Sequence, residues 1–581
     1  MPLASFDRMT EEPQNKPEAN LQALGRAVAS FFASRESGDQ TDILRELCQR
    51  LAHETGRGNS HLTLEQYADL CQSPLEFSAV GRPEEGQPIV LTEWGGLYFR
   101  RFYEYELEVA GALSVRAKRG PRAISPNTMA FFEQTVRGHL DPSQCLAVGV
   151  GLQRDLFLLT GGPGSGKTRT LVVLLACLLL EEPDLSVALS APTGKAANRL
   201  RLAMGRAMEE IALPELLRGR LLDQVWVGTV HRLLGPIPGS VEFRRNVNNR
   251  LSQNLVVVDE ASMVDLPLMG KLLSSLQEGA RLILAGDADQ LSPVQGGAVF
   301  HSLCTSLFPN QFPPEQLANL SPFSSDGIQA GNEDILPGCL VRLTRSHRYG
   351  LDSKADEIGS LCTAIREGRA EDALGLIRSS ADSLRLIESI DDPSVSEILR
   401  SGFAGLADAR NPGEAIDRLG DFRILCAHNH GRFWVEEWNH RVERIFPPGK
   451  ERPSPVVIGS NDYSVGLFNG DDGVTLANRA FFSGPSALRE FSRSRLPTHL
   501  PGHALSIHRS QGSEFNEVLI VLPPPESLVI SKELIYVAVS RAKSKVTFAG
   551  DFEAIVQSLK QDQKTVCFKV EALLNAGKCI G

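Results

Sequence analysis

Residues 161–168, "GGPGSGKT", have the composition of a loop that binds phosphate groups. They match the pattern G-x-x-x-x-G-K-[ST] and lie between one apolar run that ends at Thr160 and another that begins at Thr170. The glycines let backbone N–H groups turn toward the phosphates, and the following helix adds the positive end of its dipole. Lys167 would reach the β- and γ-phosphates, and the Thr168 hydroxyl would bind Mg²⁺. The residues expected to contact the nucleoside triphosphate are Gly161, Gly162, Pro163, Gly164, Ser165, Gly166, Lys167 and Thr168.

A pair of carboxylates follows another apolar run, in "NLVVVDEASMVD". Asp259, at the end of the expected strand, would hold Mg²⁺ through water, and Glu260 would orient and deprotonate the attacking water. An Asp-Glu pair after an apolar run is common in proteins that hydrolyse nothing. Because this pair follows a phosphate-binding loop in the same region, we interpret it as the hydrolytic pair.

Four further side chains are candidates for contacts around the γ-phosphate. Asp287 and Gln290 follow a third apolar run in "LAGDADQLSPV", and a glutamine amide can donate to phosphate and accept from water. Arg348 in "LTRSHRYG" and Arg541 in "LIYVAVSRAKSKV" lie in the second half of the chain. Either arginine alone is more often part of a surface ion pair. An arginine from a separate domain would stabilise the transition state and couple hydrolysis to domain movement.

The elements that would position these residues are buried parallel strands. The runs "DLFLLT", "VALSAPT", "NLVVVDE" and "RLILAGD" are apolar and end in small or polar residues, as in strands whose carboxyl ends carry a site. A second alternating region begins near residue 342 and contains "FRILCAH", "EVLIVLP" and "KVTFAGD". The sequence therefore predicts two α/β units in tandem. The Pro-, Gly- and Ser-rich stretch 301–340 between them is expected to be a long connector.

The residues before these units predict a small, mainly helical N-terminal domain that ends near residue 120. Apolar residues recur at helical spacing in "LQALGRAVASFFA" and "ILRELCQRLAHET". In "QPIVLTEWGGLYFRRFYEYELEVAGAL" a Gly-Gly turn between apolar runs predicts a short hairpin that enters a helix.

Composition sets the broad class of the protein. The chain has 581 residues, which suggests roughly three to four domains. Without an apolar stretch of about 18 residues or a secretory signal, we expect a cytoplasmic protein with no membrane span. The ten cysteines form no Cys-x-x-Cys pair and are expected to be buried thiols. A net charge of −10 argues against non-specific coating of nucleic acid but allows a locally basic channel.

The motifs together resemble those of the superfamily 1 DNA helicases. "GGPGSGKTRT", "SAPTGKAANRL", "VVVDEASMVD", "LAGDADQLSPV", "LTRSHRYG", "ALSIHRSQGSEFNEVLIVLP" and "YVAVSRAKSKV" occur in the order and spacing of that superfamily. More closely, they resemble the RecD family, the alpha subunits of exodeoxyribonuclease V, the RecBCD enzyme. The resemblance implies two RecA-like domains, ATP hydrolysis with Mg²⁺ at their interface and 5′ to 3′ movement on single-stranded DNA.

The resemblance also implies roles for individual residues. It supports Lys167, Thr168, Asp259 and Glu260 in ATP binding and hydrolysis and adds Gln290, Arg348 and Arg541 as γ-phosphate contacts. Gln144 resembles the adenine-reading glutamine of the family, and Gly512 and Glu514 would lie beside the nucleotide. His231 and His508, taken alone, would be read as structural histidines. The residues that would contact DNA are Pro192, Thr193, Lys195, Thr229, His231, His508 and Gln511.

The family pattern also implies insertions and a domain organisation. Residues 239–251, "GSVEFRRNVNNRL", resemble a strand-separating pin, although their basic residues also fit a solvated hairpin. The start of 456–499 resembles a small SH3-like β-barrel insertion, with Asn-Gly and Asp-Gly steps at tight turns. The expected divisions are a leader at 1–20, a partner-docking domain at 21–120, a first RecA-like domain at 121–340 and a second at 341–455 and 500–581.

Three alternatives for the whole protein remain open at this point. The N-terminal segment resembles the domain of the RecBCD alpha subunit that docks on RecC, and the chain lacks the longer N-terminal extension of stand-alone RecD-like helicases. We therefore expect a heterotrimer with RecB- and RecC-like subunits at double-stranded DNA ends, with any nuclease in a partner because this chain has no nuclease cluster. A free-standing helicase, or a DNA-binding scaffold with a nucleotide switch, would fit the same motifs.

We predict that Lys167→Gln removes nearly all ATP hydrolysis, because the ammonium supplies much of the charge stabilisation at the γ-phosphate. The measurement is steady-state phosphate release with saturating single-stranded DNA. Unchanged hydrolysis in the variant would mean that residues 161–168 do not hold the hydrolysed nucleotide.

Overall fold

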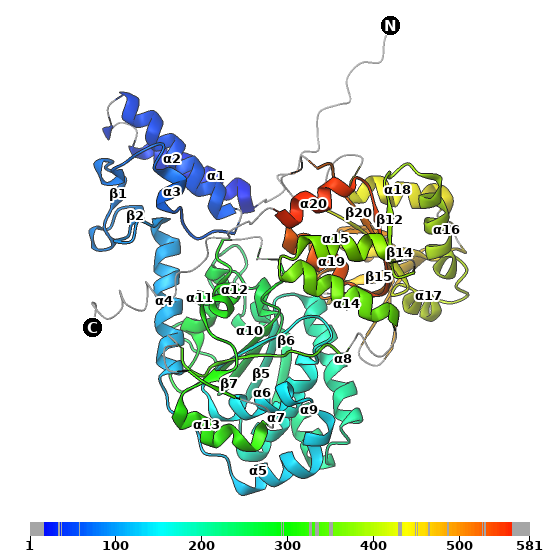
Figure 1. Cartoon of the computed structure of the whole chain (residues 1–581), viewed down its shortest axis with the longest axis horizontal. Coiled ribbons are helices and arrows are strands. Elements are labelled where there is room, and N and C mark those ends of the chain that lie inside the picture. Colours follow the sequence, from blue (N-terminus) through cyan, green and yellow to red (C-terminus); the bar gives the residue numbers. More distant parts are fainter. Residues whose placement is uncertain are drawn as a thin grey trace.

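The computed structural model describes most of the chain, and Figure 1 shows its arrangement. The described residues are 17–560 except 33–34, 37, 57, 292, 294–295, 325–327, 332–335, 348–352, 381, 428–432, 448, 450, 463–464, 485–486, 526 and 528–529, with backbone alone at 17–22, 353–356 and 560. Two separate parallel sheets, each covered by helices, follow a smaller N-terminal region.

The N-terminal region combines helices with a small sheet. Its elements are α1 (Pro17–Phe32), α2 (Gly38–Gly56), α3 (Leu64–Tyr67), β1 (Val80–Gly81), β2 (Ile89–Leu91), β3 (Leu97–Phe99) and α4 (Arg100–Ala117). Strands β2 and β3 are antiparallel and β3 leads directly into α4, which confirms the predicted hairpin and helix. Tyr98, Phe99, Phe102 and Tyr103 are buried in the core of this region, so these aromatic residues stabilise its fold.

The first large sheet has six parallel strands in the order β11-β4-β8-β7-β5-β6. The strands are β4 (Leu156–Thr160), β5 (Val187–Ala191), β6 (Val225–Thr229), β7 (Leu255–Val258), β8 (Arg281–Gly286) and β11 (Leu340–Arg342). Every residue of β4, β5, β7 and β8 is buried, as expected for continuous apolar runs covered on both faces. The four strands predicted from the sequence are therefore confirmed. The helices here are α5 (Pro126–Phe131), α6 (Pro142–Gln153), α7 (Lys167–Glu181), α8 (Gly194–Glu210), α9 (Glu215–Gln224), α10 (Val230–Leu234) and α11 (Leu266–Ser275).

The prediction that 301–340 forms a long connector is wrong. The segment contains most of α12 (Val299–Ser306), β9 (Gln311–Phe312), α13 (Pro314–Leu320) and β10 (Gln329–Ala330), and then enters β11, which pairs with β4. Pro314 stands at the first position of α13, where the missing N–H costs nothing. Phe323 is buried against Gly149 of α6, so apolar packing holds this Pro-rich segment on the first unit.

The second large sheet has five parallel strands in the order β12-β21-β20-β13-β19. The strands are β12 (Leu384–Ile387), β13 (Phe422–Cys426), β19 (Ala504–Ser506), β20 (Phe515–Val521) and β21 (Ala542–Ala549). They include the three strands predicted for the second α/β unit. The helices are α14 (Ser353–Arg366), α15 (Ala370–Ser379), α16 (Pro393–Ala407), α17 (Pro412–Arg418), α18 (Val435–Ile445), α19 (Lys532–Ser540) and α20 (Phe552–Lys560).

A separate antiparallel sheet is inserted between β13 and β19. Its strands are β14 (Ser454–Ile458), β15 (Asp472–Leu476), β16 (Arg479–Phe482), β17 (Arg489–Ser492) and β18 (His499–Pro501), in the order β17-β16-β15-β14-β18. A short hairpin over Ala477 and Asn478 joins β15 to β16. The insertion has its own small apolar cluster around Val456, Ile458 and Phe482.

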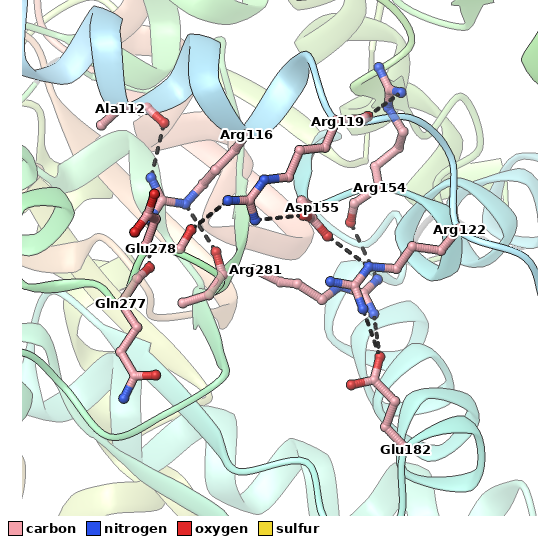
Figure 2. A network of polar contacts seen from close by, with 11 residues as sticks. Ala112, Arg116, Arg119, Arg122, Arg154, Asp155, Glu182, Gln277, Glu278 and Arg281 are labelled. Atoms are coloured by element: carbon pink, nitrogen blue, oxygen red, sulfur yellow. Dashed lines mark hydrogen bonds and ion pairs between the residues drawn. The ribbon is translucent and has the colours of Figure 1, made fainter.

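A network of arginines fixes the end of α4 to the first large sheet (Figure 2). Arg119 and Arg122 form ion pairs with Asp155, at 3.0 and 2.8 Å, immediately before β4. Arg116 donates from Nε to the carbonyl oxygen of Ala280, 3.0 Å away, immediately before β8. These contacts attach the end of α4 at the amino ends of β4 and β8, opposite the carboxyl ends that carry the predicted site. Figure 1 shows α4 running along the side of this unit.

Most of the cysteines are buried, as the sequence predicts. Seven of the eight cysteines among the described residues are buried thiols. Within the described ranges, no helix combines the length and the apolar character needed to cross a membrane.

We predict that Glu106→Gln changes how the stability of the N-terminal region depends on pH. Glu106 is fully buried on α4 and accepts a hydrogen bond from Tyr98 at 3.0 Å. Burial raises its pKa from 4.5 to about 7. As pH rises between these values, only the unfolded chain loses the proton, so the free energy of unfolding falls by about 3 kcal/mol and is constant above them. The glutamine variant lacks this loss.

Hydrogen exchange of the amides in α4 at about pH 5 and about pH 8 measures the effect. Relative to the unmodified protein, Glu106→Gln should slow exchange at the higher pH and have little effect at the lower pH. Glu104→Gln, on the exposed face of the same helix, is the matched control. If the exchange rate of Glu106→Gln relative to the unmodified protein were the same at both pH values, the prediction would be contradicted.

Candidate functional site

The phosphate-binding loop lies between β4 and α7, as the sequence predicts. Gly164 and Gly166 have φ angles of 73° and 80°, a conformation that favours glycine. A Cβ at Gly166 would overlap the Gln144 amide, so this position also lacks room for a side chain. Lys167 Nζ donates to the carbonyl oxygens of Gly161 and Gly162, at 2.6 and 3.2 Å. The ammonium therefore lies over the loop, where phosphate oxygens could replace the two carbonyls.

Gln144 holds this loop from behind. It is 1% exposed at the start of α6, where its Oε1 accepts from the Asp141 N–H and its Nε2 donates to the Ser165 carbonyl, both at 3.0 Å. Asp141 Oδ2 lies 2.7 Å from His347 Nε2. Burial alone would raise the pKa of Asp141. Hydrogen bonds from Ser143, Gln144 and His347 nevertheless keep this pKa below its ordinary value. The Gln144 Nε2 thus positions the loop, while its Oε1 completes the cap at the start of α6.

Asp259 and Glu260 stand at the carboxyl end of β7, and the backbone between strand and loop is strained. Glu260 has a φ of 53°, which is uncommon for a residue other than glycine and is often found at functional sites. Its N–H donates to Asp259 Oδ1 at 2.9 Å. Burial, and then the charge of Glu260, raise the pKa of Asp259, while Lys167 lowers it. The buried Asp259 carboxylate and the half-buried Glu260 carboxylate are therefore adjacent, and the lysine lies near enough to lower the pKa of Asp259.

Asp287 and Gln290 follow the neighbouring strand β8. Asp287 is fully buried, and burial raises its pKa. Gln290 is 6% exposed, and its Nε2 lies 3.4 Å from Asp287 Oδ2. Gln290 Oε1 is buried and has no hydrogen-bond partner among the residues that the structure describes.

The predicted arginines have different outcomes. Arg541 is the C-cap of α19 and is 3% exposed. Its guanidinium donates to the carbonyl oxygens of Val537 and Ser513, at 3.1 and 3.3 Å, and to the Ser540 hydroxyl. These contacts hold it on its own half of the molecule. Arg348 lies outside the described residues, but its neighbour His347 donates its N–H to the Gly164 carbonyl at 2.8 Å.

A cavity of about 400 Å³ lies between the two large sheets, beside the phosphate-binding loop. Its wall includes residues from the second half of the chain, Gly512, Glu514, Arg541 and Lys543, opposite residues of the first half, Gly164, Ser165, Gly166, Lys167, Thr168, Asp259, Glu260 and Gln290. Within the described chain, Ser165 Oγ, Glu260 Oε2 and Gln290 Oε1 are buried without hydrogen-bond partners. Three such atoms line this one cavity beside Lys167, so the cavity is suited to a polar ligand that supplies the missing partners. Backbone donors, a lysine and carboxylates fit a nucleoside triphosphate with a divalent cation.

The residues predicted to contact DNA lie at strand ends on both sheets. Thr193 follows β5 and Thr229 ends β6. Each hydroxyl caps the next helix by accepting a backbone N–H, from Ala196 at 3.2 Å and from Arg232 at 3.1 Å. Pro192 precedes Thr193 and is half-buried. His231 is exposed, with its ring 5.8 Å from that of Phe243. Their side chains are thus partly used to cap or pack local structure.

Lys195 forms an ion pair with Asp472 of β15, so the inserted sheet contacts the first unit here. His508 and Gln511 lie after β19, and burial lowers the pKa of His508, which favours a neutral ring. Arg199 of α8 contacts both the carbonyl oxygen of Gly512, at 2.6 Å, and the carboxylate of Glu514. These cross-contacts border a second cavity of about 810 Å³. Its basic lining residues are Arg169, Lys195, Arg199, Arg201, Arg206, Arg232, Arg423, Arg489 and Lys543.

Several residues around these two cavities were not predicted from the sequence. His347, Arg199 and Asp472 line them from distant parts of the chain, and Tyr536 hydrogen-bonds to Asp287. Tyr536 lies in "LIYVAVSRAKSKV", five residues before Arg541, and His347 lies in "LTRSHRYG", next to Arg348. Their positions within these motifs could have identified them. Asp472 had no comparable signal.

Comparison with known proteins agrees with this geometry. A model of the "AAA domain" family matches residues 144–296, and one of the "UvrD-like helicase C-terminal domain" matches residues 501–549. The RecBCD enzyme subunit RecD of Mycobacterium tuberculosis is 36% identical over 487 residues, covering 80% of this chain and 77% of that protein. The RecD subunit of Haemophilus influenzae is 31% identical over 528 residues, covering 81% and 79%.

The fold and the site define an ATP-dependent DNA helicase with a phosphate-binding loop at the junction of two RecA-like parallel sheets. Within this class, the chain belongs to the RecD family. It is also similar to the ATP-dependent RecD2 DNA helicase of Deinococcus radiodurans, at 28% identity over 479 residues, covering 79% of this chain and 56% of that protein.

We predict that Gln144→Ala weakens ATP and GTP binding by a similar factor, about tenfold, because it removes the hydrogen bond that positions the Ser165 carbonyl. Competition with a fluorescent nucleotide measures both affinities without requiring hydrolysis. A loss confined to ATP would contradict a role in positioning the loop and would support the reading of adenine implied by the family pattern.

Proposed function

We propose that the chain is the 5′ to 3′ helicase subunit of a RecBCD-type helicase and nuclease that acts in double-strand break repair and homologous recombination. The observation that carries this proposal is the cavity between the two large sheets, which phosphate-binding residues of one sheet share with Arg541 and Lys543 of the other. ATP bound there would contact both sheets, so hydrolysis would change how they pack. Similarity to RecD subunits supports DNA as the polymer on which this motion acts.

In the proposed hydrolysis, Lys167 exchanges its two carbonyl contacts for the β- and γ-phosphates of ATP. Thr168 and Asp259 would hold Mg²⁺, which when bound neutralises phosphate charge. Glu260, whose Oε2 has no partner in the described chain, would accept a proton from the attacking water. Gln290 and Arg541 would contact the γ-phosphate from opposite sheets, with Arg348 as a second cation. Arg541 must first exchange its contacts on α19 and Ser513.

For the DNA path, we place single-stranded DNA across the carboxyl ends of both sheets. The contacting residues would be Pro192, Thr193, Lys195, Thr229, His231, His508 and Gln511. The basic lining of the second cavity supports this placement, since phosphate groups are attracted to local positive charge. A DNA phosphate at Lys195 would have to replace Asp472, so DNA binding is expected to loosen the inserted sheet from the first unit.

The proposed domain organisation follows the sequence prediction. It comprises a leader at 1–20, a docking domain at 21–120, RecA-like domains at 121–340 and at 341–455 with 500–581, a pin at 239–251 and an SH3-like barrel at 456–499. The antiparallel order β17-β16-β15-β14-β18 supports the barrel. The pin is supported by two exposed apolar side chains at 239–251, Val241 and Val247, which are 71% and 59% exposed. Phe31 and Leu64 are exposed apolar residues on the domain that would dock on a RecC-like subunit, with the nuclease in a RecB-like subunit.

A second candidate is a helicase that acts without partner subunits. The similarity to the Deinococcus radiodurans RecD2 helicase favours it, because the aligned part covers 79% of this chain. The nucleotide site would work in the same way in both cases, so the two candidates differ only in assembly.

We predict that the protein with ATP and Mg²⁺ unwinds a duplex with a single-stranded 5′ tail and leaves a 3′-tailed duplex intact. Glu260→Gln should lose at least about a hundredfold in hydrolysis and unwinding while retaining ATP binding, because only proton transfer from water is removed. Strand displacement on both substrates is the measurement, and Glu397→Gln, on the exposed face of α16, is the control. Unwinding from the 3′ tail, or unwinding that Glu260→Gln leaves unchanged, would contradict the proposal.

Strand displacement by the chain alone, compared with strand displacement by the chain co-expressed with RecB- and RecC-like subunits, decides between the two candidates. If the chain is a subunit, it will copurify with RecB- and RecC-like chains when they are co-expressed, and the complex will unwind much faster than the chain alone. A lone monomer of equal activity would exclude the subunit and leave the stand-alone helicase.

A further inference from the structure

A buried hydrogen bond joins the two large sheets directly behind the phosphate-binding loop. The Tyr536 hydroxyl, on α19 of the second unit, donates to Asp287 Oδ2, at the end of β8 in the first unit, over 3.0 Å. Tyr536 is 3% exposed and Asp287 fully buried. Because leaving either group unpaired in the interior would be costly, the contact strongly favours one arrangement of α19 against the first sheet.

At the first sheet, the tyrosine shares its acceptor with the proposed γ-phosphate sensor. Gln290 Nε2 lies 3.4 Å from the same Asp287 oxygen, while Asp287 Oδ1 accepts from the Asp289 N–H at 3.1 Å. The hydroxyl also lies against the phosphate-binding loop, since a Cβ at Gly162 would be 3.4 Å from it. Any movement of Gln290 toward a phosphate therefore changes the surroundings of the tyrosine hydroxyl.

At the second sheet, the tyrosine lies on the helix that presents the proposed finger arginine. Tyr536 and Arg541 stand within α19 and at its C-cap, and Arg541 donates to the carbonyl oxygen of Val537, the residue after the tyrosine. Most of α19 is buried, from Leu534 to Ser540, so the helix moves as one body. A shift of Tyr536 relative to Asp287 must therefore shift Arg541 relative to the cavity.

Tyr536 stays a hydrogen-bond donor, and Asp287 requires that donor. Burial, and then the charge of Asp287, raise its pKa well above the ordinary value, so the hydroxyl keeps its proton. Asp287 needs that donor because Gln290 is its more distant partner, at 3.4 Å against 3.0 Å. When the Gln290 amide turns toward a phosphate, Tyr536 is the side chain that remains on Asp287 Oδ2.

We propose that Tyr536 is a positioning residue that couples phosphate sensing by Gln290 in one sheet to the placement of Arg541 in the other. The inference rests on the proposed ATP hydrolysis at this site. With the hydroxyl present, Asp287 can release Gln290 without losing its buried donor, and α19 stays docked while Arg541 turns to the γ-phosphate. Without the hydroxyl, Asp287 retains Gln290, and α19 loses its hydrogen bond to the first unit.

The test is Tyr536→Phe, which removes one oxygen atom and keeps the ring in its apolar surroundings. We expect kcat for DNA-stimulated ATP hydrolysis to fall about tenfold and KM for ATP to change less than about twofold, because the hydroxyl acts after the nucleotide is bound. The matched control is Tyr67→Phe in the N-terminal region. Tyr67 is 1% exposed and donates to the Gly95 carbonyl at 2.9 Å, so the control removes an equally buried hydroxyl.

The two variants separate positioning from stability. Both should lower the melting temperature, and Tyr536→Phe alone should lower kcat. An unchanged kcat in Tyr536→Phe, or an equal loss of kcat in Tyr67→Phe, would overturn the inference. Combining Tyr536→Phe with Gln290→Ala adds a second check, because residues that act in one step give a double variant no slower than the slower single variant. Fully multiplicative losses would also overturn it.

These outcomes differ from a failure of the proposed function. If the unmodified protein with DNA hydrolyses no ATP, the proposed function fails and the inference fails with it. If the unmodified protein is active and Tyr536→Phe matches it, only the inference fails.

Discussion

The structure depends on a junction at which three buried polar atoms lack hydrogen-bond partners within the described part of the chain. Ser165, Glu260 and Gln290 each present such an atom to the cavity between the sheets, and Lys167 donates there to carbonyl oxygens of its own loop. Unpaired buried polar groups destabilise a fold, so they persist where a ligand supplies the missing hydrogen bonds. The left-handed backbone of Glu260 adds strain at the same place. Stability is thus reduced where triphosphate binding would restore it.

The contacts between the two halves of the chain surround that junction. Tyr536 joins α19 to Asp287, Arg199 joins α8 to Gly512 and Glu514, and Lys195 joins the first unit to Asp472 of the inserted sheet. All three are polar and can be exchanged for other partners, unlike the apolar packing inside each unit. Hydrolysis can therefore alter the interface between the units while leaving each apolar core intact. Exchangeable polar contacts between the units, together with stable apolar packing inside each unit, suit a motor in which rigid domains move against each other.

The sequence was informative wherever function depends on neighbouring residues in the chain. The glycines around Lys167, the acidic pair after β7 and the apolar runs of the strands are local patterns, and the structure places them as expected. The prediction of a connector at 301–340 was wrong because prolines and serines interrupt the apolar residues of this segment and obscure their pattern. These apolar residues pack the segment on α6 and β4. Gln144 was recognised by position, but its contacts with Asp141 and Ser165 required the folded loop.

The sequence by itself determined the phosphate-binding loop, the parallel strands and the candidate hydrolytic residues, because each depends on local spacing, helix and strand periodicity or backbone freedom. Only the tertiary structure decided which side chains meet across the junction. Tyr536 lies 249 positions from Asp287 and Lys195 lies 277 from Asp472, so no local pattern links the members of either pair. Their contacts arise from the packing of two separate sheets and an insertion, a property of the folded chain as a whole.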